Sequence, residues 1–349
     1  MKVLITGGAG FIGCNTAKRF LERGDEVMVL DNLSRHASQI TNIHWLKAMD
    51  RRLEFVQGDI RDYKLLRRLF HENDFGAVIH LAAQTAVTTS VTDPRLDFET
   101  NALGSFNLLE AIREENRDPA ILYASTNKVY GGMEDVGIVE RNGRYDYENL
   151  PSGVPESRSL DFHSPYGCSK GTADQYMIDY SRIYGLRTVT FRQSCIYGFR
   201  QFGMEDQGWV AWFTIAAVVG KPIVIYGDGK QVRDLLFIDD LVDLYELALA
   251  KIDLYAGQAF NVGGGPNNCV SLLESLAMLE ELIGRRIPYS VAEWRPGDQR
   301  VFICDYSKAR ATFGWEPRVS PAVGIRQLYE WVVDNQSLFA SPPPAMSDR

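Results

Sequence analysis

The sequence predicts an α/β fold, a Rossmann-type doubly wound parallel sheet followed by a smaller, mixed α/β domain. Apolar, strand-like segments alternate with helical patterns, and the strands are expected at 3–7, 26–31, 53–57, 77–82, 120–125 and 186–192. This alternation is typical of a parallel sheet covered by helices. The first strand also runs into a glycine-rich turn that opens a helix, a combination common in dinucleotide-binding domains.

The pattern divides the chain into two domains and a tail. We expect the larger domain at 1–190 with about 235–262, and the smaller one at 191–234 with 263–338. Residues 339–349 are rich in proline and serine, so we expect a disordered tail. The polar stretch 131–160 reads as a surface insertion, either a lid over a cleft or a disordered loop.

Composition limits the function. The 349 residues are 45% hydrophobic and carry a net charge of -8, so nothing favours a nucleic acid partner. The five cysteines form no CxxC pair and the five histidines show no ligand spacing, so we expect no metal. No apolar span or signal peptide is evident, and a cytoplasmic protein without a membrane partner is expected.

The turn Gly7–Gly13 has the spacing of a dinucleotide-binding motif. Gly7 can make the tight turn, Gly10 lets the backbone approach a pyrophosphate, and Gly13 lets the helix pack closely on the sheet. The phosphates would lie at the helix N-terminus, beside Phe11 and Ile12, because the free N–H groups there favour an anion. The turn therefore predicts a bound dinucleotide.

Residues after the second and third strands would hold the adenosine half. Asp31 closes the second strand, where a carboxylate accepts hydrogen bonds from ribose hydroxyls and repels a 2'-phosphate. We therefore expect NAD rather than NADP, and Arg35 is the one nearby residue that could weaken this preference. Asn32 belongs to the same predicted site, and Asp59 and Ile60 would meet the adenine.

Tyr166 and Lys170 form a candidate proton-transfer pair. A hydroxyl-bearing carbon gives up hydride only if the hydroxyl proton leaves as well, so a base must touch that hydroxyl. Tyr166 is the predicted base. Lys170 lies one helical turn further on, where its positive charge would favour tyrosinate.

These features resemble the extended short-chain dehydrogenase/reductases that act on nucleotide sugars, from Met1 to about Asn335. The resemblance also rests on Leu81-Ala82-Ala83-Gln84, Asn101, Ser125-Thr126-Asn127-Lys128-Val129-Tyr130-Gly131 and Arg295-Pro296-Gly297-Asp298. It implies that the larger domain binds the cofactor with Leu81, Ala82, Ala83, Gln84, Asn101 and Ser125, besides Tyr166 and Lys170. It also implies that Thr126 is catalytic and hydrogen-bonds the reacting oxygen.

The resemblance further implies a nucleotide sugar held by the smaller domain. Arg233 and Arg295 stand where the family grips a diphosphate with two guanidinium groups, although structural ion pairs would also explain either arginine. The other substrate contacts that it implies are Gln84, Thr126, Asn127, Lys128, Cys195, Gln201, Tyr226 and Asp298.

The two residues after Thr126 bear on the reaction. The 4,6-dehydratases of the family have Asp-Glu there to eliminate water, whereas this chain has Asn127 and Lys128, so dehydration is not expected. The chain instead resembles family members that invert C2 of a CDP-hexose by transient oxidation, with NAD tightly bound and regenerated in each cycle. Three strings carry this resemblance: Ser125–Gly131, Asp161–Gly171 and Arg200–Val210.

Three alternatives remain open. A 4-epimerase of UDP-sugars would use the same motifs, a net reductase would consume reduced cofactor, and a non-catalytic NAD-binding protein would turn nothing over. The helical patterns at 93–116 and 164–184 have more apolar residues than one core-facing stripe needs. In the family such helices pair subunits, which implies self-association as a dimer or tetramer.

Overall fold

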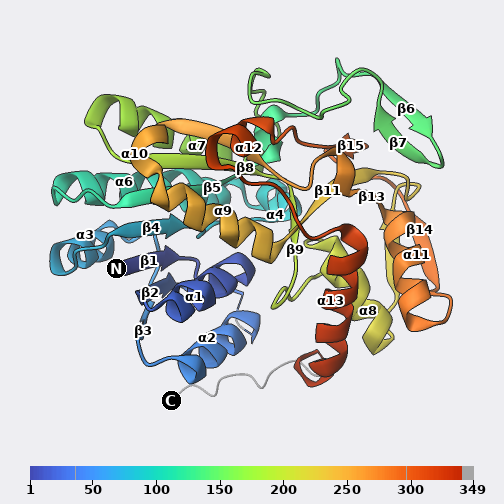
Figure 1. Ribbon diagram of the computed structural model, residues 1–349, viewed down its shortest axis with the longest axis horizontal. Helices are drawn as coiled ribbons and strands as arrows, with labels where there is room; N and C mark the ends of the chain where they lie inside the picture. The colour runs from blue at the N-terminus through green and yellow to red at the C-terminus, as the bar shows by residue number, and fades with distance from the viewer. Residues whose placement is uncertain (36, 296, 340–349) are drawn as a thin grey trace.

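The computed structural model describes residues 1–35, 37–295 and 297–339. The predicted tail beyond Phe339 and Pro296 of the predicted Arg295–Asp298 motif lie outside the described residues. A seven-stranded parallel sheet forms the centre, in the order β12-β8-β5-β4-β1-β2-β3 (Figure 1). Its strands are β1 (Lys2–Thr6), β2 (Glu26–Asp31), β3 (Leu53–Gln57), β4 (Ala77–His80), β5 (Ala120–Thr126), β8 (Thr188–Gln193) and β12 (Gln258–Val262). The six predicted strands are confirmed, and β12 adds a seventh that the pattern did not predict.

Helices cover both faces of this sheet because its strands are apolar on both sides. Val3 and Ile5 of β1 point into one core cluster, which α1 and α9 complete, whereas Leu4 points into a second cluster with α3, α6 and α7. The helices of this part are α1 (Phe11–Arg23), α2 (Ala37–Met49), α3 (Tyr63–Glu72), α4 (Val87–Thr92), α5 (Pro94–Phe98), α6 (Gly104–Glu114), α7 (Ser164–Tyr184), α9 (Ile238–Ala250) and α10 (Ile252–Tyr255). A π-helix, η1 (Glu99–Leu103), joins α5 to α6, and η2 (Asn127–Tyr130) is a short 3-10 helix after β5.

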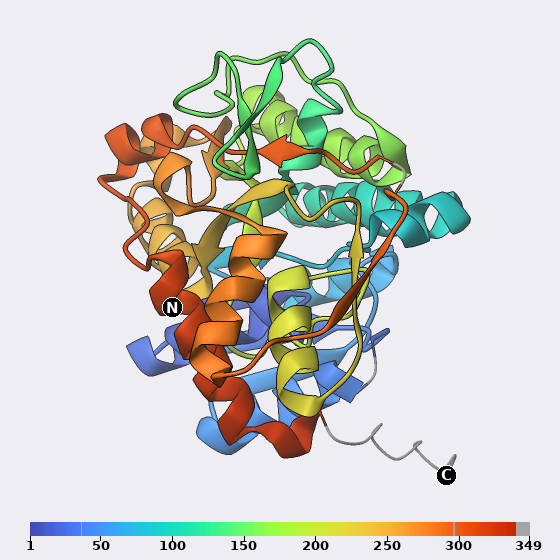
Figure 2. The same cartoon turned by 90° about the vertical axis from the view of Figure 1, so that its right-hand side faces the viewer.

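The C-terminal part is smaller and mixed, as predicted. Strand β11 (Val232–Phe237) pairs with β9 (Cys195–Tyr197) and β15 (Val301–Phe302) in parallel and with β13 (Cys269–Ser271) antiparallel. Strand β10 (Ile223–Tyr226) pairs with β14 (Tyr289–Ala292). Helices α8 (Trp209–Val219), α11 (Leu272–Ile283) and α13 (Pro321–Asp334) pack together beside them (Figure 2). The remaining elements are α12 (Ser307–Phe313), η3 (Pro266–Asn268) and η4 (Gln336–Leu338).

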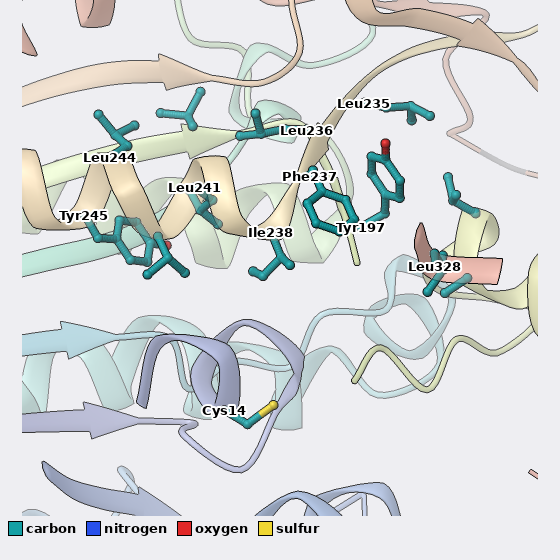
Figure 3. Packing of buried hydrophobic residues seen from close by; sticks show 14 of the residues in the cluster. Cys14, Tyr197, Leu235, Leu236, Phe237, Ile238, Leu241, Leu244, Tyr245 and Leu328 are labelled. Carbon is teal, nitrogen blue, oxygen red and sulfur yellow. The ribbon is translucent and has the colours of Figure 1, made fainter. Parts of the chain in front are cut away.

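The two parts share one apolar core. Figure 3 shows Leu241, Leu244 and Tyr245 of α9 close to Leu236 and Phe237 of β11, and all five belong to one buried cluster. Helix α9 packs on α1 and β12 joins the large sheet, while β11 belongs to the small one. The predicted division of the chain into two domains therefore stays a prediction.

The insertion at 131–160 is packed against the C-terminal part. Strands β6 (Ile138–Arg141) and β7 (Arg144–Tyr147) form a hairpin, seen at the upper right of Figure 1. Asn142 and Gly143 make its turn with φ of 52° and 79°, the left-handed conformation that a tight hairpin turn requires. Tyr147 and Val154 are buried with Phe302. The apolar residues scattered through this polar stretch thus anchor it.

Among the described residues no helix combines the length and the apolar character that crossing a membrane requires. Within the same residues no group of histidine, cysteine and acidic side chains has the arrangement of a metal site.

Candidate active site

The glycine turn lies between β1 and α1, against the segment after β4. Gly7 has φ of 69°, and a Cβ there would stand 2.7 Å from the backbone N of Ala82. A Cβ at Gly13 would stand 2.3 Å from the carbonyl oxygen of Gly7, so the first turn of α1 packs directly on the loop. No acidic residue lies in the first turn of α1, and the helix begins at Phe11, followed by Ile12. This backbone arrangement fits a pyrophosphate.

Asp31 braces this turn from the end of β2. Its buried carboxylate accepts hydrogen bonds from the backbone N–H of Ala9 at 3.0 Å and of Leu33 at 2.9 Å, and from Gln39 Nε2 at 3.0 Å. Burial raises the pKa of Asp31, and the two backbone hydrogen bonds oppose the shift. Arg35 Nη2 donates to Thr85 Oγ1 at 3.1 Å, in the loop after β4, and its effect on cofactor preference stays a prediction.

Of the predicted adenine contacts, Asp59 is hydrogen-bonded to Asn32, whereas Ile60 is buried. Asn32 Nδ2 donates to Asp59 Oδ2 at 2.9 Å. Burial would raise the pKa of Asp59, but hydrogen bonds from Arg61 and Asn32 outweigh it and lower this pKa to about 2. Ile60 is buried in the core under Gly104, where a Cβ would stand 2.6 Å from it.

The structure brings Thr126, at the end of β5, to Tyr166 in the first turn of α7. Thr126 Oγ1 accepts from the backbone N–H of Lys128 at 3.3 Å, and the Thr126 side chain lies beside Tyr166. Burial raises the pKa of Tyr166 to about 12; the bond from Thr126 opposes this, and the charge of Asp97 adds to it. Tyr166 therefore keeps its proton at neutral pH in this state.

Lys170 lies one turn beyond Tyr166 on α7, as predicted, and is buried. Its Nζ donates to the carbonyl oxygen of Ala124 at 2.5 Å and lies 4.3 Å from the centre of the Tyr123 ring. Burial lowers the pKa of Lys170 to about 7, although Asp174 and Asp97 oppose the shift. The expected action of its charge on Tyr166 stays a prediction, since the contacts of Nζ in the described structure are to Ala124 and Tyr123.

Asp97 and Ser169 join this site although the sequence analysis missed them. Asp97, fully buried on α5, accepts from Ser169 Oγ at 2.5 Å, from Gln84 Nε2 at 2.8 Å and from Asn101 Nδ2 at 3.2 Å. Asn101 lies in the π-helix, a geometry frequent at functional sites, and its Oδ1 accepts from the backbone N–H of Gln84 at 2.8 Å. Two features of the sequence could have indicated these residues. Asp97 lies four residues before Asn101, on the same side of a helix, and Ser169 directly precedes Lys170.

This network positions the loop after β4, whose residues Leu81, Ala82 and Ala83 are partly buried. Leu81 N–H and Ala82 N–H both reach Thr6 Oγ1, at 3.2 Å and 3.3 Å. The side chain of Gln84 is engaged on both ends, because its Oε1 accepts from the N–H of Ala86 at 2.6 Å. Ser125, on β5, donates to Asp174 Oδ2 at 2.7 Å.

Lys128 faces a cleft of about 430 Å³. Its Nζ donates to Gln299 Oε1 at 3.3 Å. Burial, then the nearby charge of Arg233, lowers the pKa of Lys128 to about 8, and Asp298 opposes the shift. The insertion supplies one wall of this cleft, which is lined by Val87, Lys128, Gly131, Gly132, Met133, Glu134, Val136, Ile138, His163, Ser164, Gly297, Asp298, Gln299 and Arg300.

Arg295 and Asp298 are joined by a backbone hydrogen bond, in which the N–H of Asp298 donates to the carbonyl oxygen of Arg295 at 3.1 Å, and Arg233 reaches Asp298 from β11. Arg233 Nη2 donates to Asp298 Oδ1 at 2.7 Å, so this arginine is ion-paired. Arg295 instead lies over the Tyr226 ring, 3.9 Å from its centre, and donates to the carbonyl oxygen of Glu205 at 2.9 Å.

Three further predicted residues lie around this region. Cys195 is on β9, and burial raises the pKa of its thiol to about 12. Gln201 Nε2 donates to the carbonyl oxygen of Ile196 at 3.3 Å, while its buried Oε1 has no hydrogen-bond partner in the part of the chain that the structure describes. Asn127 Oδ1 lies 3.3 Å from Thr126 Oγ1.

Known proteins match this fold and these motifs along nearly the whole chain. Residues 4–328 match the family model described as GDP-mannose 4,6 dehydratase. The chain belongs to this family. This match confirms the resemblance to nucleotide-sugar short-chain dehydrogenase/reductases, because the relatives are named as epimerases and dehydratases of nucleotide sugars. The CDP-paratose 2-epimerase of Salmonella typhi is 47% identical over 336 residues, which cover 95% of this chain and 99% of that protein.

Solved structures of family members agree with the fold. A UDP-glucose 4-epimerase from Thermotoga maritima with UDP-glucose has a TM-score of 0.83 and 32% identity, covering 96% of this chain and 100% of its own. A dTDP-glucose 4,6-dehydratase from Streptomyces venezuelae with NAD bound has a TM-score of 0.82 and 29% identity. The match covers 97% of this chain and 98% of that one. One fold thus carries both epimerases and dehydratases, and NAD occurs with it.

Proposed function

We propose that this chain is an NAD-dependent 2-epimerase of a CDP-hexose, converting CDP-paratose to CDP-tyvelose. The observation that carries the proposal is the 47% identity, over nearly the full length of both chains, to a CDP-paratose 2-epimerase. Asn127 and Lys128 support it, because elimination of water would need an acid and a base beside Thr126. CDP-glucose, which would become CDP-mannose by the same inversion, is a candidate second substrate.

The glycine turn supports NAD as the cofactor. The close approach of Gly13 to the carbonyl oxygen of Gly7 leaves no room for a side chain there, and α1 offers free N–H groups at its start. Asp31 stands at the end of β2, where it would meet the ribose hydroxyls. When bound, NAD would accept hydride from C2 and return it to the opposite face of the keto sugar, while its positive charge would favour tyrosinate.

Side chains of this protein would transfer the proton of the C2 hydroxyl. Tyr166 would take the proton of the C2 hydroxyl and give it back after the sugar has turned over, and Thr126 would hold the same oxygen. Thr126 lies beside Tyr166, so both side chains can reach one oxygen of the substrate. Lys128 would hold a neighbouring hydroxyl or the keto oxygen, and Gln201 Oε1, buried without a donor in the described structure, would accept from another.

Arg233 and Arg295 would hold the diphosphate. Arg295 has no carboxylate partner among the described residues, and its contacts to a ring and a carbonyl leave its charge unneutralised. Arg233 would either leave Asp298 and bind phosphate, or bind phosphate while keeping its ion pair with Asp298. Tyr226 and Cys195 would border the nucleotide.

The test is proton NMR of the purified protein with CDP-paratose or CDP-glucose in deuterium oxide, without added cofactor. We expect conversion to the C2 epimer with no deuterium at C2, because the hydride returns internally. Tyr166→Phe, which removes only the hydroxyl, should abolish the conversion. Loss of the C2 proton signal to deuterium would contradict internal return.

A 4-epimerase of UDP-sugars is the second candidate, supported by the 32% identity and matching fold of the Thermotoga maritima enzyme. The same NMR experiment with UDP-glucose decides between the two, since formation of UDP-galactose without any reaction of CDP-sugars would replace our proposal. A net reductase would show a stoichiometric loss of reduced-nicotinamide absorbance. A non-catalytic protein would show neither.

We also propose that the chain self-associates through α7 and the segment before α6. Exposed apolar side chains gather on these elements: Phe98, Leu103, Tyr176, Ile183 and Tyr184. Such a cluster is unfavourable in water and typical of an interface. Light scattering should give a multiple of the 39.3 kDa chain mass.

A further inference from the structure

The turn between β9 and α8 carries a carboxylate beside the proposed nucleotide site. Backbone hydrogen bonds of 2.9 Å and 3.0 Å between Met204 and Gln207 close this turn, so Glu205 and Asp206 form its tip. Tyr226 OH donates to Glu205 Oε1 at 2.6 Å. The carbonyl oxygen of Glu205 accepts from Arg295 Nη2 at 2.9 Å.

The same turn is tied to the cofactor side of the cleft. Gln207 Nε2 donates to Thr85 Oγ1, and Thr88 Oγ1 donates to Asp206 Oδ2 at 3.3 Å. The position of Glu205 is thus held from both sides rather than by one contact. Its second carboxylate oxygen, Oε2, has no hydrogen bond in the described part of the chain and is free to accept one.

The surroundings of Glu205 suit a planar base joined to a diphosphate. The Tyr226 ring and the Arg295 guanidinium stack at 3.9 Å, and Trp294 packs against Gly227, where a Cβ would stand 2.7 Å from its ring. Aromatic rings and guanidinium planes stack on bases, and a free guanidinium binds phosphate. A nucleoside diphosphate whose phosphates reach Arg295 would therefore place its base next to Tyr226 and Glu205.

We propose that Glu205 selects cytosine over uracil in the nucleotide substrate. This proposal rests on the proposed function, because it takes the Tyr226 and Arg295 region as the nucleotide site. Cytosine carries an amino group at the position where uracil carries a carbonyl oxygen. A carboxylate can only accept, so Glu205 Oε2 would bind the cytosine amino group and repel the uracil oxygen.

Nearby amides do not decide this choice. The amide of Gln207 meets a hydroxyl, which can donate or accept, so either of its ends can face the cleft. Gln201 Oε1 is an acceptor, because its Nε2 faces the carbonyl oxygen of Ile196, and we have assigned it to the sugar. The Glu205 carboxylate combines a charge, an oxygen without a donor among the described residues and direct contact with Tyr226.

The experiment measures binding of CDP and UDP to the NAD-loaded protein by titration calorimetry. A charge-assisted hydrogen bond predicts that CDP binds at least about tenfold more tightly than UDP. In Glu205→Gln, Tyr226 would keep Oε1 as its acceptor, and the amide NH₂ would face the base. That variant should lose the preference for CDP or reverse it. Asp206→Asn, which removes the neighbouring charge of the same turn, should keep the wild-type ratio.

Two results would overturn the proposal: equal binding of CDP and UDP by the wild type, or an unchanged ratio in Glu205→Gln. Failure of the reaction is a separate outcome. If the protein binds CDP selectively through Glu205 but inverts no CDP-hexose at C2, the base assignment stands and the proposed reaction falls.

Discussion

Asp174 is expected to be one of the costliest charged residues to replace. Its carboxylate accepts from Arg192 Nε at 3.0 Å and Nη2 at 2.9 Å, and from Ser125 Oγ at 2.7 Å. The side chains of Arg192 and Asp174 are 6% and 0% exposed. Asp174→Asn keeps the volume but removes the charge. The buried guanidinium then loses its anion and keeps only neutral acceptors, one amide oxygen of the new Asn and the Tyr130 hydroxyl at 3.2 Å.

Breaking a buried ion pair by changing one partner costs about 3–5 kcal/mol. The free energy of unfolding of Asp174→Asn, measured by urea titration at neutral pH, should fall by that amount. Asp118→Asn is the control, because the ion pair of Asp118 with Arg187 is exposed, and its loss should stay within about 1 kcal/mol. If Asp174→Asn also lost less than about 1 kcal/mol, the reasoning from burial would be refuted.

Three further predictions concern the site. Burial lowers the pKa of Lys170 from 10.5 to about 7. Between these two pH values the unfolded chain binds more protons than the folded chain. The free energy of unfolding of the cofactor-free protein should therefore rise with pH, by up to about 1.4 kcal/mol per pH unit. Lys170→Met should remove this contribution in urea titrations across that range, and an unchanged slope would contradict the burial of the charge. Gly13→Ala should strip bound cofactor from the purified protein, seen in its absorbance, because the new Cβ meets the Gly7 carbonyl oxygen at 2.3 Å, whereas Gly10→Ala, at 3.1 Å, should lose less. The double change Asn127→Asp, Lys128→Glu should lower C2 epimerisation at least about 100-fold in the NMR assay while cofactor is retained, and full activity would remove the argument that this pair defines the reaction.

Much of the fold was predictable because the parallel strands are buried on both faces and therefore read as apolar runs. β12 was missed because Gln258 and Asn261 interrupt its pattern. The insertion was read as polar surface because its packing depends on Phe302 and Val301, far away in the sequence, against which Tyr147 and Val154 are buried. Periodicity within one segment does not report such a partner.

The site was predictable where a motif fixes local geometry, as in the first two turns of α7, which carry Tyr166 and Lys170 on one side. It was not predictable where a contact depends on two distant elements. The pairing of Arg233 with Asp298, and the stacking of Arg295 on Tyr226, distinguish two arginines that look equivalent in the sequence. Asp97 escaped notice because an acidic residue in a helix is usually solvated, and only the packing of α5 on α7 buries it.

The local charges explain how a chain with a net charge of -8 would hold the dianionic diphosphate of the proposed substrate. Salt screens exposed charges beyond roughly 8 Å at physiological ionic strength, so the acidic surface contributes little inside the cleft. Lys128, Arg233 and Arg300 stand within or beside that cleft. Burial lowers the pKa of Lys128, and repulsion by the charge of Arg233 lowers it further. Asp298 offsets part of this positive charge. A bound diphosphate would relieve the same repulsion, so the cost of assembling these cations is recovered only when an anion is present, which favours an anionic substrate over a neutral sugar.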